Sequence, residues 1–301
     1  MSRPTPSSGE QALHDWLASR PGTGTFVGDD LAVLGPAGGT LLVGVDPVLD
    51  GVHLLVREAG HAAAGRKAMN RNLSDVAAMG ATPVAATLSI LAPRDLTMEQ
   101  AKQIIGAAEA AGDLYNCPLV GGDFATWGDD AGKLAVTVSI LARADQPVPR
   151  RGARVGDTLF VTGALGGSIF GRHLTFTPRV DLGQTLAGKA RAMLDLSDGL
   201  GRDLPRLLGE LGARLDHIPI HQDAHQHDDG RDPIWHAIYD GEDYELLLAG
   251  EASLAKEIPE LIAIGVVTQG PGIELATGDA IQTLKPGGWN HTLGSTGPRS
   301  S

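Results

Sequence analysis

The sequence predicts a two-domain protein of the α/β (α+β) class, and three observations support this prediction. The chain has 301 residues, more than one hydrophobic core usually fills, so two domains of about 150 residues each are expected. Segments with the residue pattern of strands alternate with helical segments in both halves. Near the middle, the stretch ADQPVPRRGARVGD (144–157) is rich in Pro and Arg, as is typical of a boundary between domains. We therefore place one domain at residues 1–146 and the other at residues 147–301.

The first half of the chain contains three strand candidates and two helix candidates. The segment TLLVGVDPV (40–48) is apolar and rich in β-branched residues, which predicts a strand. The Ala- and Met-rich segment 61–79 predicts a helix that ends at Gly80. The same criteria predict the other elements of this half, which are strands at 84–91 and 133–144 and a helix at 99–112.

The second half of the chain repeats this alternation. The patterns predict one helix, at 200–211, and strands at 158–162, 192–196, 244–249 and 262–268. Residues 236–240 lead into the third of these strands. The first ten and the last eight residues are rich in Ser, Gly and Pro, so we expect both ends to fray.

The composition excludes several classes of protein. Lys and Arg total 24 against 36 Asp and Glu, which gives a formal net charge of −12. A surface this acidic repels nucleic acids and anionic membranes, so neither is an expected partner, but it suits a protein that holds cations. No segment approaches the roughly 20 apolar residues of a membrane helix, and the N-terminus lacks the apolar stretch of a secretory signal. The single cysteine, Cys117, excludes internal disulfides, so a cytoplasmic location is expected.

Aspartates recur beside glycine or at the edges of the predicted elements. They lie in GDD (28–30), at Asp46, at Asp75, in GGD (121–123), in LDLSDGL (194–200) and in DGED (240–243). Mg²⁺ prefers a few carboxylates together with substrate phosphates, and a neighbouring glycine lets the backbone approach a ligand. Each Asp-Gly pair also has an ordinary interpretation as a turn, and Asp198 as the cap of the following helix.

Asp75 is the aspartate that is hardest to explain structurally. It lies in the predicted helix among Leu73, Val76 and Met79, where an unpaired carboxylate is costly to bury unless it binds a metal. The alternative is an ion pair within the helix with Arg71, four residues earlier.

Several catalytic motifs are absent from the sequence. It contains no P-loop, no GxSxG, no CxxC and no HExxH string, which argues against a P-loop, acyl transfer and zinc hydrolysis. The glycine cluster GALGGS (163–168) follows a predicted strand and has two interpretations, a phosphate-binding turn or packing. Cys117 lies in the apolar YNCPLV, which favours a core position over a nucleophile.

Histidines are the other candidate ligands. The segment 217–227 carries His217, His221, His225 and His227, which has the spacing of a soft-metal site but also the composition of a solvated loop. His53 follows an Asp-Gly turn directly after a predicted strand. At that position it either reaches a ligand or is a half-exposed structural histidine.

Seven strings, in this order, resemble the thiamine-monophosphate kinase family. They are VGDDLAVL, VDPVLDGVH, NLSDVAAMGATP, GGD, RRGARVGDTLFVTG, LDLSDGL and GEDYEL. The resemblance extends from about Phe26 to Trp289, and NLSDVAAMG followed by GEDYEL is specific for this family. The family belongs to the superfamily of aminoimidazole ribonucleotide synthetase.

The resemblance implies a fold, an activity and partners. The fold is the two-domain aminoimidazole ribonucleotide synthetase-like fold, in which N-terminal strands pair into a barrel shared by a homodimer. The activity is direct transfer of the ATP γ-phosphoryl group to thiamine monophosphate, with several Mg²⁺ ions. No catalytic side chain is implied, because phosphoryl transfer depends on positioning and charge neutralisation.

The resemblance also assigns individual residues. The residues that match metal ligands are Asp30, Asp46, Asp75, Asp123, Asp195 and Asp198. Those that match ATP contacts are Gly122, Asp123, Arg150 and Ser197. Those that match positions near the thiamine phosphate are His53, Glu242 and Trp289. In these roles, the planar fork of Arg150 suits a triphosphate, and the ring of Trp289 suits a cationic thiazolium.

The chain departs from the family pattern in three places. Gly44 and Val45 precede Asp46 where the family usually has Ser or Thr, and Phe124 and Ala125 follow GGD where it usually has Thr-Thr. The stretch 164–177 is shorter than the helical insert that the family usually carries. Two alternatives to the kinase activity therefore stay open. One is an ATP-dependent enzyme of the superfamily acting on another small substrate, and the other is a non-catalytic protein that binds nucleotide or thiamine phosphate.

Overall fold

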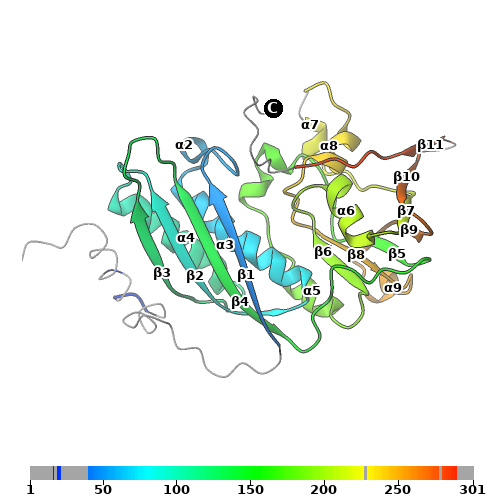
Figure 1. The fold of residues 1–301 in the computed structure, drawn as a ribbon, viewed down its shortest axis with the longest axis horizontal. Helices are drawn as coiled ribbons and strands as arrows, with labels where there is room; N and C mark the ends of the chain where they lie inside the picture. Colours follow the sequence, from blue (N-terminus) through cyan, green and yellow to red (C-terminus); the bar gives the residue numbers. More distant parts are fainter. Residues whose placement is uncertain (1–15, 17–18, 22–39, 227–228, 278–279, 290–301) are drawn as a thin grey trace, which may run out of the picture.

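The computed structural model describes residues 16, 19–21, 40–226, 229–277 and 280–289. It contains two β-sheets with helices packed against them, so the predicted mixed α/β class is confirmed. In Figure 1 the two sheets lie on opposite sides of the molecule, and helix α3 (His61–Ala78) runs between them. Within the described residues, no helix is both long and apolar enough to cross a membrane.

The first sheet has four strands in the order β1-β4-β2-β3. These are β1 (Thr40–Leu49), β4 (Ala135–Ala144), β2 (Thr82–Ala92) and β3 (Leu119–Thr126). Strands β1, β4 and β2 pair antiparallel, whereas β2 and β3 pair in parallel. The parallel pair is connected through α4 (Met98–Asp113), as expected for a crossover.

Helix α3 connects the two halves of the structure. It packs against α4 and strands β1 and β4 on one side, and against α5 (Val180–Leu186) and β6 (Ala192–Asp195) on the other. The small side chains of the helix permit this double contact, because Ala63, Ala64, Ala68 and Ala77 are all buried. At Gly65 a Cβ atom would lie 1.9 Å from the carbonyl oxygen of Ile104, so only glycine permits the close approach of α3 to α4.

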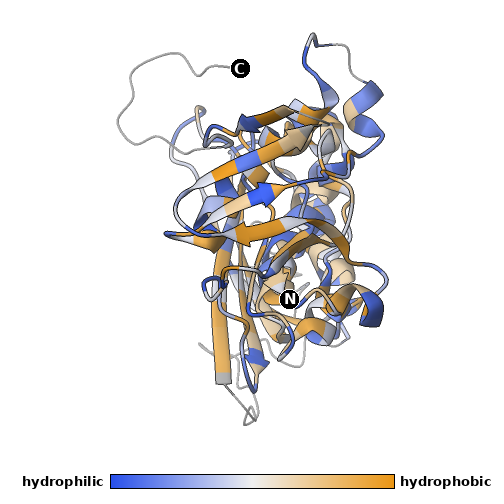
Figure 2. Cartoon of the chain, turned by 90° about the vertical axis from the view of Figure 1, so that its right-hand side faces the viewer, coloured by the Kyte–Doolittle hydropathy of each residue, from blue (hydrophilic) through white to orange (hydrophobic). Residues whose placement is uncertain are grey.

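The second sheet has seven strands in the order β11-β10-β7-β9-β5-β8-β6. Besides β6, these are β5 (Thr158–Val161), β7 (Gly212–Leu215), β8 (Leu246–Gly250), β9 (Ile262–Thr268), β10 (Gly272–Thr277) and β11 (Ala280–Thr283). In Figure 2, many of the strand residues are hydrophobic and many of the connecting loops are hydrophilic.

The remaining helices are short. They are α2 (Val56–Ala59), α6 (Leu200–Leu208), α7 (Asp223–Gln226), α8 (Pro233–Tyr239), α9 (Leu254–Glu257) and the 3₁₀ turns η2 (Ser168–Phe170) and η3 (Arg172–Leu174). The η2 and η3 turns lie within the stretch 164–177.

The strongly patterned elements lie where the sequence predicts them, and the exceptions have physical causes. Strand β3 was not predicted, because Gly121, Gly122 and Asp123 interrupt its apolar run and have low strand propensity. The predicted helix 200–211 ends at Leu208, since Gly209 takes a left-handed φ of 65°. Residues 236–240 are the end of helix α8 rather than a lead into a strand.

The predicted domains at 1–146 and 147–301 correspond to the residues of the two sheets, but the cores are not separate. The core around α3 also includes Phe160, Val180 and Met193, from the second half. The division at residue 146 therefore stays a prediction.

We expect Gly65→Ala to destabilise the protein by roughly 1–3 kcal/mol, because the new methyl group pushes α3 away from the backbone of α4. Gly106→Ala is the matched control, since Gly106 lies inside α4 and a methyl group added there would have no heavy atom within 4 Å. That variant should be neutral or stabilising by up to about 1 kcal/mol. Urea unfolding measures both. Equal effects of the two substitutions would contradict the close-approach argument.

Candidate functional site

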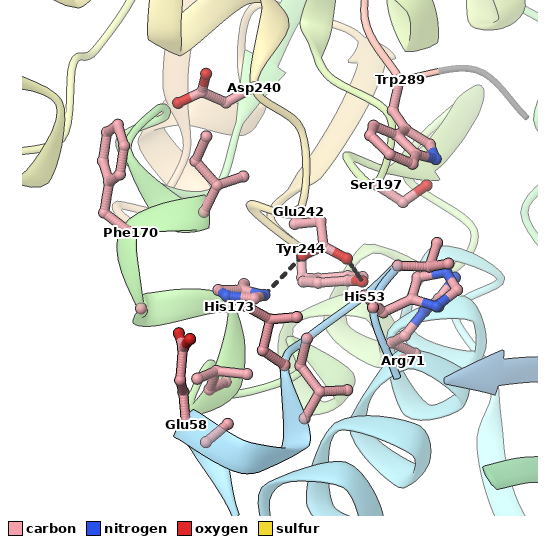
Figure 3. Close-up of a pocket in the computed structure, with 18 of the residues that line it drawn as sticks. His53, Glu58, Arg71, Phe170, His173, Ser197, Asp240, Glu242, Tyr244 and Trp289 are labelled. Atoms are coloured by element: carbon pink, nitrogen blue, oxygen red, sulfur yellow. Dashed lines mark hydrogen bonds and ion pairs between the residues drawn. The ribbon is translucent and has the colours of Figure 1, made fainter. Parts of the chain in front are cut away.

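A pocket of about 650 Å³ lies between the two halves of the structure. Its wall combines the loop after β1 with α2, the η2 and η3 turns, the loop after β6, the loop before β8, and Trp289. In the view of Figure 3, Trp289, Ser197, His53 and Arg71 lie on one side, and Phe170 and Glu58 on the other. We call this cavity the central pocket.

The central pocket brings together five residues that the sequence analysis singled out. His53, Ser197, Asp198, Glu242 and Trp289 all line it, although they come from four different segments. The His53 side chain is buried, and its Nδ1 accepts a hydrogen bond from the Leu49 amide at 3.0 Å. Trp289 lines the same pocket and is 44% exposed.

The loop that carries Glu242 has a strained backbone. Glu242 and Tyr244 have φ values of 55° and 53°, a left-handed conformation that is unfavourable for residues other than glycine. Two backbone hydrogen bonds fix it, from the amide of Glu242 to the carbonyl of Ser197 at 2.8 Å and from Tyr244 to Leu196 at 2.9 Å. The loop is therefore locked to the segment that follows β6.

A buried lysine connects three walls of the central pocket. Lys67 of α3 is fully buried, and its Nζ lies 2.7 Å from the carbonyl oxygen of His53, 2.7 Å from Glu242 Oε2 and 2.5 Å from His173 Nδ1. His173 Nδ1 also lies 2.7 Å from Glu242 Oε2. Lys67 thus orients the Glu242 carboxylate and anchors the loop of His53.

Two side chains of this group, Lys67 and Glu242, have shifted pKa values. Burial lowers the pKa of Lys67 to about 8, although Glu242 opposes the shift. Burial alone would raise the pKa of Glu242, but the hydrogen bond from His173 and the charge of Lys67 lower it to about 2. At neutral pH the pair is therefore a buried ion pair that faces the pocket.

Beside the central pocket lies a second group, Asp46, Asp75 and Asp195, which we call the aspartate cluster. Asp46 comes from β1, Asp75 from α3 and Asp195 from the end of β6. Desolvation raises the pKa of Asp75 well above its usual value, and the charges of Asp195 and Asp46 raise it further. Desolvation also raises the pKa of Asp195 to about 6, against a hydrogen bond of 2.7 Å from Ser74 Oγ. A bound cation would relieve the repulsion among these carboxylates in their desolvated site.

Two arginines act on the aspartate cluster. The charges of Arg71 and Arg150 both lower the pKa values of Asp75 and Asp195, against the desolvation. Arg71 directs its guanidinium to Asp46 Oδ2 at 2.9 Å and to the Pro47 carbonyl at 2.7 Å. The ion pairs of the described residues therefore do not include the suggested pair of Arg71 with Asp75. Arg71 instead links α3 to β1.

Two of the predicted site residues lie away from both the central pocket and the aspartate cluster. Gly122 and Asp123 lie on β3, the strand at the opposite edge of the first sheet from β1. Asp46, Val138, Leu88 and Gly122 share one row across the sheet, which separates Asp46 from Gly122 by about 14 Å. The next residue, Asp123, faces the other side of the sheet and is exposed. Asp30 lies outside the described residues.

Asp198 has partners other than those predicted. Its carboxylate pairs with Arg206 at 2.8 Å and with Arg202 at 3.4 Å. The N-cap of α6 is Gly199, so the interpretation of Asp198 as the helix cap is wrong. Among the described residues, no group of three or more His, Cys, Asp or Glu side chains is arranged to hold a metal ion by itself.

The glycine cluster 163–168 packs rather than binding a phosphate. The amides of Gly166 and Gly167 donate to the carboxylates of Asp243 and Asp240 at 3.0 Å each, so acceptors within the chain already occupy them. In the histidine segment, His221 Nδ1 lies 3.1 Å from Asp223 Oδ2, while His217 and His225 are exposed. His227 lies outside the described residues.

Comparison with known proteins identifies the family. Residues 28–144 match the family description "AIR synthase related protein, N-terminal domain". The thiamine-monophosphate kinase of Rhodopirellula baltica is 39% identical over 79% of this chain and 81% of its own length. The chain belongs to the thiamine-monophosphate kinase family. The kinase of Aquifex aeolicus is 30% identical over 88% of this chain and 92% of its own.

Solved structures agree with membership of the thiamine-monophosphate kinase family. A structure described as AaThiL complexed with AMPPCP and TMP superposes with a TM-score of 0.77 and 28% identity, over 94% of this chain and 97% of its own. The hydrogenase maturation protein HypE in complex with ATP superposes with a TM-score of 0.75 at 17% identity, over 93% of this chain and 96% of its own. At that identity the likeness shows the fold alone.

Three residues of the site, Lys67, His173 and Tyr244, were not predicted from the sequence, and Arg71 was predicted only as a structural partner of Asp75. One signal was available for the two cations: Lys67, Arg71 and Asp75 are spaced four residues apart in an Ala-rich helix, which places all three on one face. His173 carries no such signal, because an irregular segment brings it to the pocket.

We expect the Lys67–Glu242 pair to give a pH-dependent contribution to stability. Glu242→Gln should lower the free energy of unfolding at pH 7 by about 3 kcal/mol, which corresponds to the lowering of the Glu242 pKa from 4.5 to about 2. Because the folded-state pKa lies below the unfolded one, this contribution is complete above pH 4.5 and is lost as the pH falls towards 2. Urea unfolding of both proteins across this range measures the difference.

Glu58→Gln is the control for this experiment, since Glu58 also lines the pocket but its side chain is 65% exposed. It should leave the unfolding midpoint unchanged. A Glu242→Gln effect that stays constant from neutral to acid pH would show that the carboxylate charge contributes nothing.

Proposed function

We propose that this protein transfers the γ-phosphoryl group of ATP to thiamine monophosphate. An oxygen of the thiamine phosphate forms the new P–O bond, the bond to the β-phosphate oxygen of ATP breaks, and the products are thiamine diphosphate and ADP. The observation that carries the proposal is the juxtaposition of the central pocket with the aspartate cluster, which meet at Arg71. The relatives named above as thiamine-monophosphate kinases support the choice of substrates.

The aspartate cluster is the proposed site of Mg²⁺. Its carboxylates are hard oxygen ligands. Desolvation and neighbouring carboxylates raise the pKa values of Asp75 and Asp195 despite two nearby arginines, so the negative charge of the site is incompletely compensated. Asp75 and Asp195 would hold the metal beside Asp46, which pairs with Arg71, with Asp30 and Asp198 as further proposed ligands and substrate phosphates completing the coordination. Bound Mg²⁺ supplies charge neutralisation between two polyanions that otherwise repel.

Arg150 and Ser197 are the proposed ATP contacts nearest the aspartate cluster. Arg150 is exposed and close enough for its charge to act on Asp75 and Asp195, so its fork can receive a triphosphate. Ser197 lines the central pocket between Asp195 and Asp198, at the point where donor and acceptor would meet.

The acceptor would occupy the central pocket. Trp289 offers an exposed ring for the cationic thiazolium, and the ionised Glu242 adds a fixed negative charge. His53 presents its ring at the wall, with Nδ1 already used as an acceptor. These residues bind and orient the substrate, and no general base is required because the attacking phosphate oxygen is already anionic.

Gly122 and Asp123 fit the proposal only if a second copy of the chain takes part. In one chain they lie about 14 Å from Asp46 across the sheet. The outer face of β1 exposes Leu41, Val43 and Val45, a row of apolar side chains that a partner would cover. We propose a homodimer that joins these faces and brings Gly122 and Asp123 of one protomer to the nucleotide.

The proposed location is the cytoplasm, where the phosphoryl donor ATP is available. The state of Cys117 agrees with a reducing compartment, because this cysteine is buried and free.

A product assay tests the proposed function. Purified protein with ATP, Mg²⁺ and thiamine monophosphate should give thiamine diphosphate, detected by chromatography, and EDTA should abolish the product. ATP binding without thiamine diphosphate would contradict the proposed reaction. A panel of other phosphoryl acceptors would then distinguish a different acceptor from a non-catalytic nucleotide-binding protein.

We expect Asp75→Asn to lower kcat at least about 100-fold without unfolding the protein. Because desolvation and like charges disfavour the Asp75 carboxylate in the folded state, its removal should keep or raise the melting temperature measured in EDTA. Asp113→Asn, at the exposed end of α4, is the control and should leave both quantities unchanged. Full activity of Asp75→Asn would overturn its assignment to the metal site.

A further inference from the structure

Arg71 lies at the boundary between the aspartate cluster and the central pocket. It lines the pocket, yet its side chain is only 12% exposed. The guanidinium pairs with Asp46 Oδ2 at 2.9 Å and donates to the Pro47 carbonyl at 2.7 Å. These two contacts attach the end of the guanidinium to β1.

The guanidinium of Arg71 lies among acidic side chains. Burial acts to lower its pKa, but the phenol of Tyr244 and the carboxylates of Asp46, Glu242 and Asp195 act in the opposite direction and raise it overall. The same charge acts on the carboxylates of Asp75 and Asp195. Arg71 therefore interacts electrostatically with every member of the aspartate cluster, although it forms an ion pair with Asp46.

The charges in this region point to a particular role. The cluster contains three carboxylates, and the guanidinium of Arg71 forms an ion pair with one of them, Asp46. The other two would balance the charge of a single divalent cation. The residues before Asp46, Gly44 and Val45, carry no side-chain oxygen, so β1 offers a metal only the carboxylate that Arg71 already pairs.

We propose that Arg71 is a resident cation of the aspartate cluster: it neutralises Asp46 and takes the place of one divalent cation. The chain then binds fewer divalent ions than its carboxylates would otherwise accept. Arg71 is a positioning residue in this account, since it sets the charge and orientation of Asp46. The inference deepens the proposed function and rests on it for the identity of the site, but its test does not require turnover.

The experiment is a titration with Mn²⁺, monitored by the electron paramagnetic resonance of the free ion, in the absence of nucleotide. Arg71→Met removes the charge, Arg71→Gln also keeps a donor for the Pro47 carbonyl, and Arg71→Lys retains a charge. We expect the Met and Gln variants to bind one additional Mn²⁺, or to bind Mn²⁺ at least about tenfold more tightly. Arg71→Lys should resemble the wild type.

A second readout separates this role from a purely structural one. In EDTA, the Met and Gln variants should melt at a lower temperature than the wild type, because the cluster then lacks its counter-charge. Mg²⁺ should restore most of this loss, whereas a lost structural contact would be insensitive to Mg²⁺. If Arg71→Met fails to fold without metal, the Gln variant and refolding in Mn²⁺ still supply the comparison.

Unchanged Mn²⁺ stoichiometry and affinity in folded variants would overturn the proposal. The product assay stands apart from this result. A wild-type protein that makes no thiamine diphosphate, but whose Arg71 variants bind extra Mn²⁺, would refute the proposed reaction and retain the role of Arg71. Product formation with unchanged Mn²⁺ binding would support the proposed reaction and refute the role of Arg71.

Discussion

The repulsion among Asp46, Asp75 and Asp195 is the constraint on which the site depends. Three carboxylates from a strand, a helix and the end of another strand share a desolvated space, and the pKa values of Asp75 and Asp195 are raised as a result. Such an arrangement lowers stability unless cations compensate it. The fold therefore leaves negative charge uncompensated at the aspartate cluster, where the proposed reaction joins two polyanions. Arg71 and Arg150 supply part of the compensation, and Mg²⁺ would supply the rest.

Helix α3 organises this distribution of charge. Lys67, Arg71 and Asp75 follow one another at intervals of four residues, so they lie along one face of the helix. Lys67 fixes Glu242 and His53 at the central pocket, Arg71 occupies the boundary, and Asp75 belongs to the aspartate cluster. The same helix also packs closely against its neighbours, through buried alanines and through Gly65 at its contact with α4. One helix thus serves as both the packing centre and the support of the site.

The sequence predicted the periodic elements well, because their patterns are local. The segments 40–48, 61–79 and 99–112 correspond closely to β1, α3 and α4. Strand β3 was missed, since its Gly-Gly-Asp sequence disfavours a strand and only pairing with β2 stabilises it. The likeness to the family identified candidate site residues, but the sequence did not show that Gly122 and Asp123 lie at the far edge of the sheet. That placement depends on strand order, which no local pattern encodes.

The buried partners of the site were the least predictable from the sequence. His173 reaches Lys67 and Glu242 through the irregular η3 turn, so nothing in its local sequence distinguishes it from a surface histidine. Arg71 was weighed only as the partner of Asp75, because spacing along a helix is visible in a sequence and a contact with β1 is not. The structure instead directs this guanidinium to Asp46.

The most direct test of the account is anomalous diffraction from crystals grown with Mn²⁺ and a non-hydrolysable ATP analogue. We expect an Mn²⁺ peak at the aspartate cluster, bound by the carboxylates of Asp75 and Asp195 at about 2.2 Å. The nucleotide phosphates should contact the same ion, and Arg71 should remain on Asp46. A nucleotide bound with its phosphates away from a metal-free aspartate cluster would contradict it.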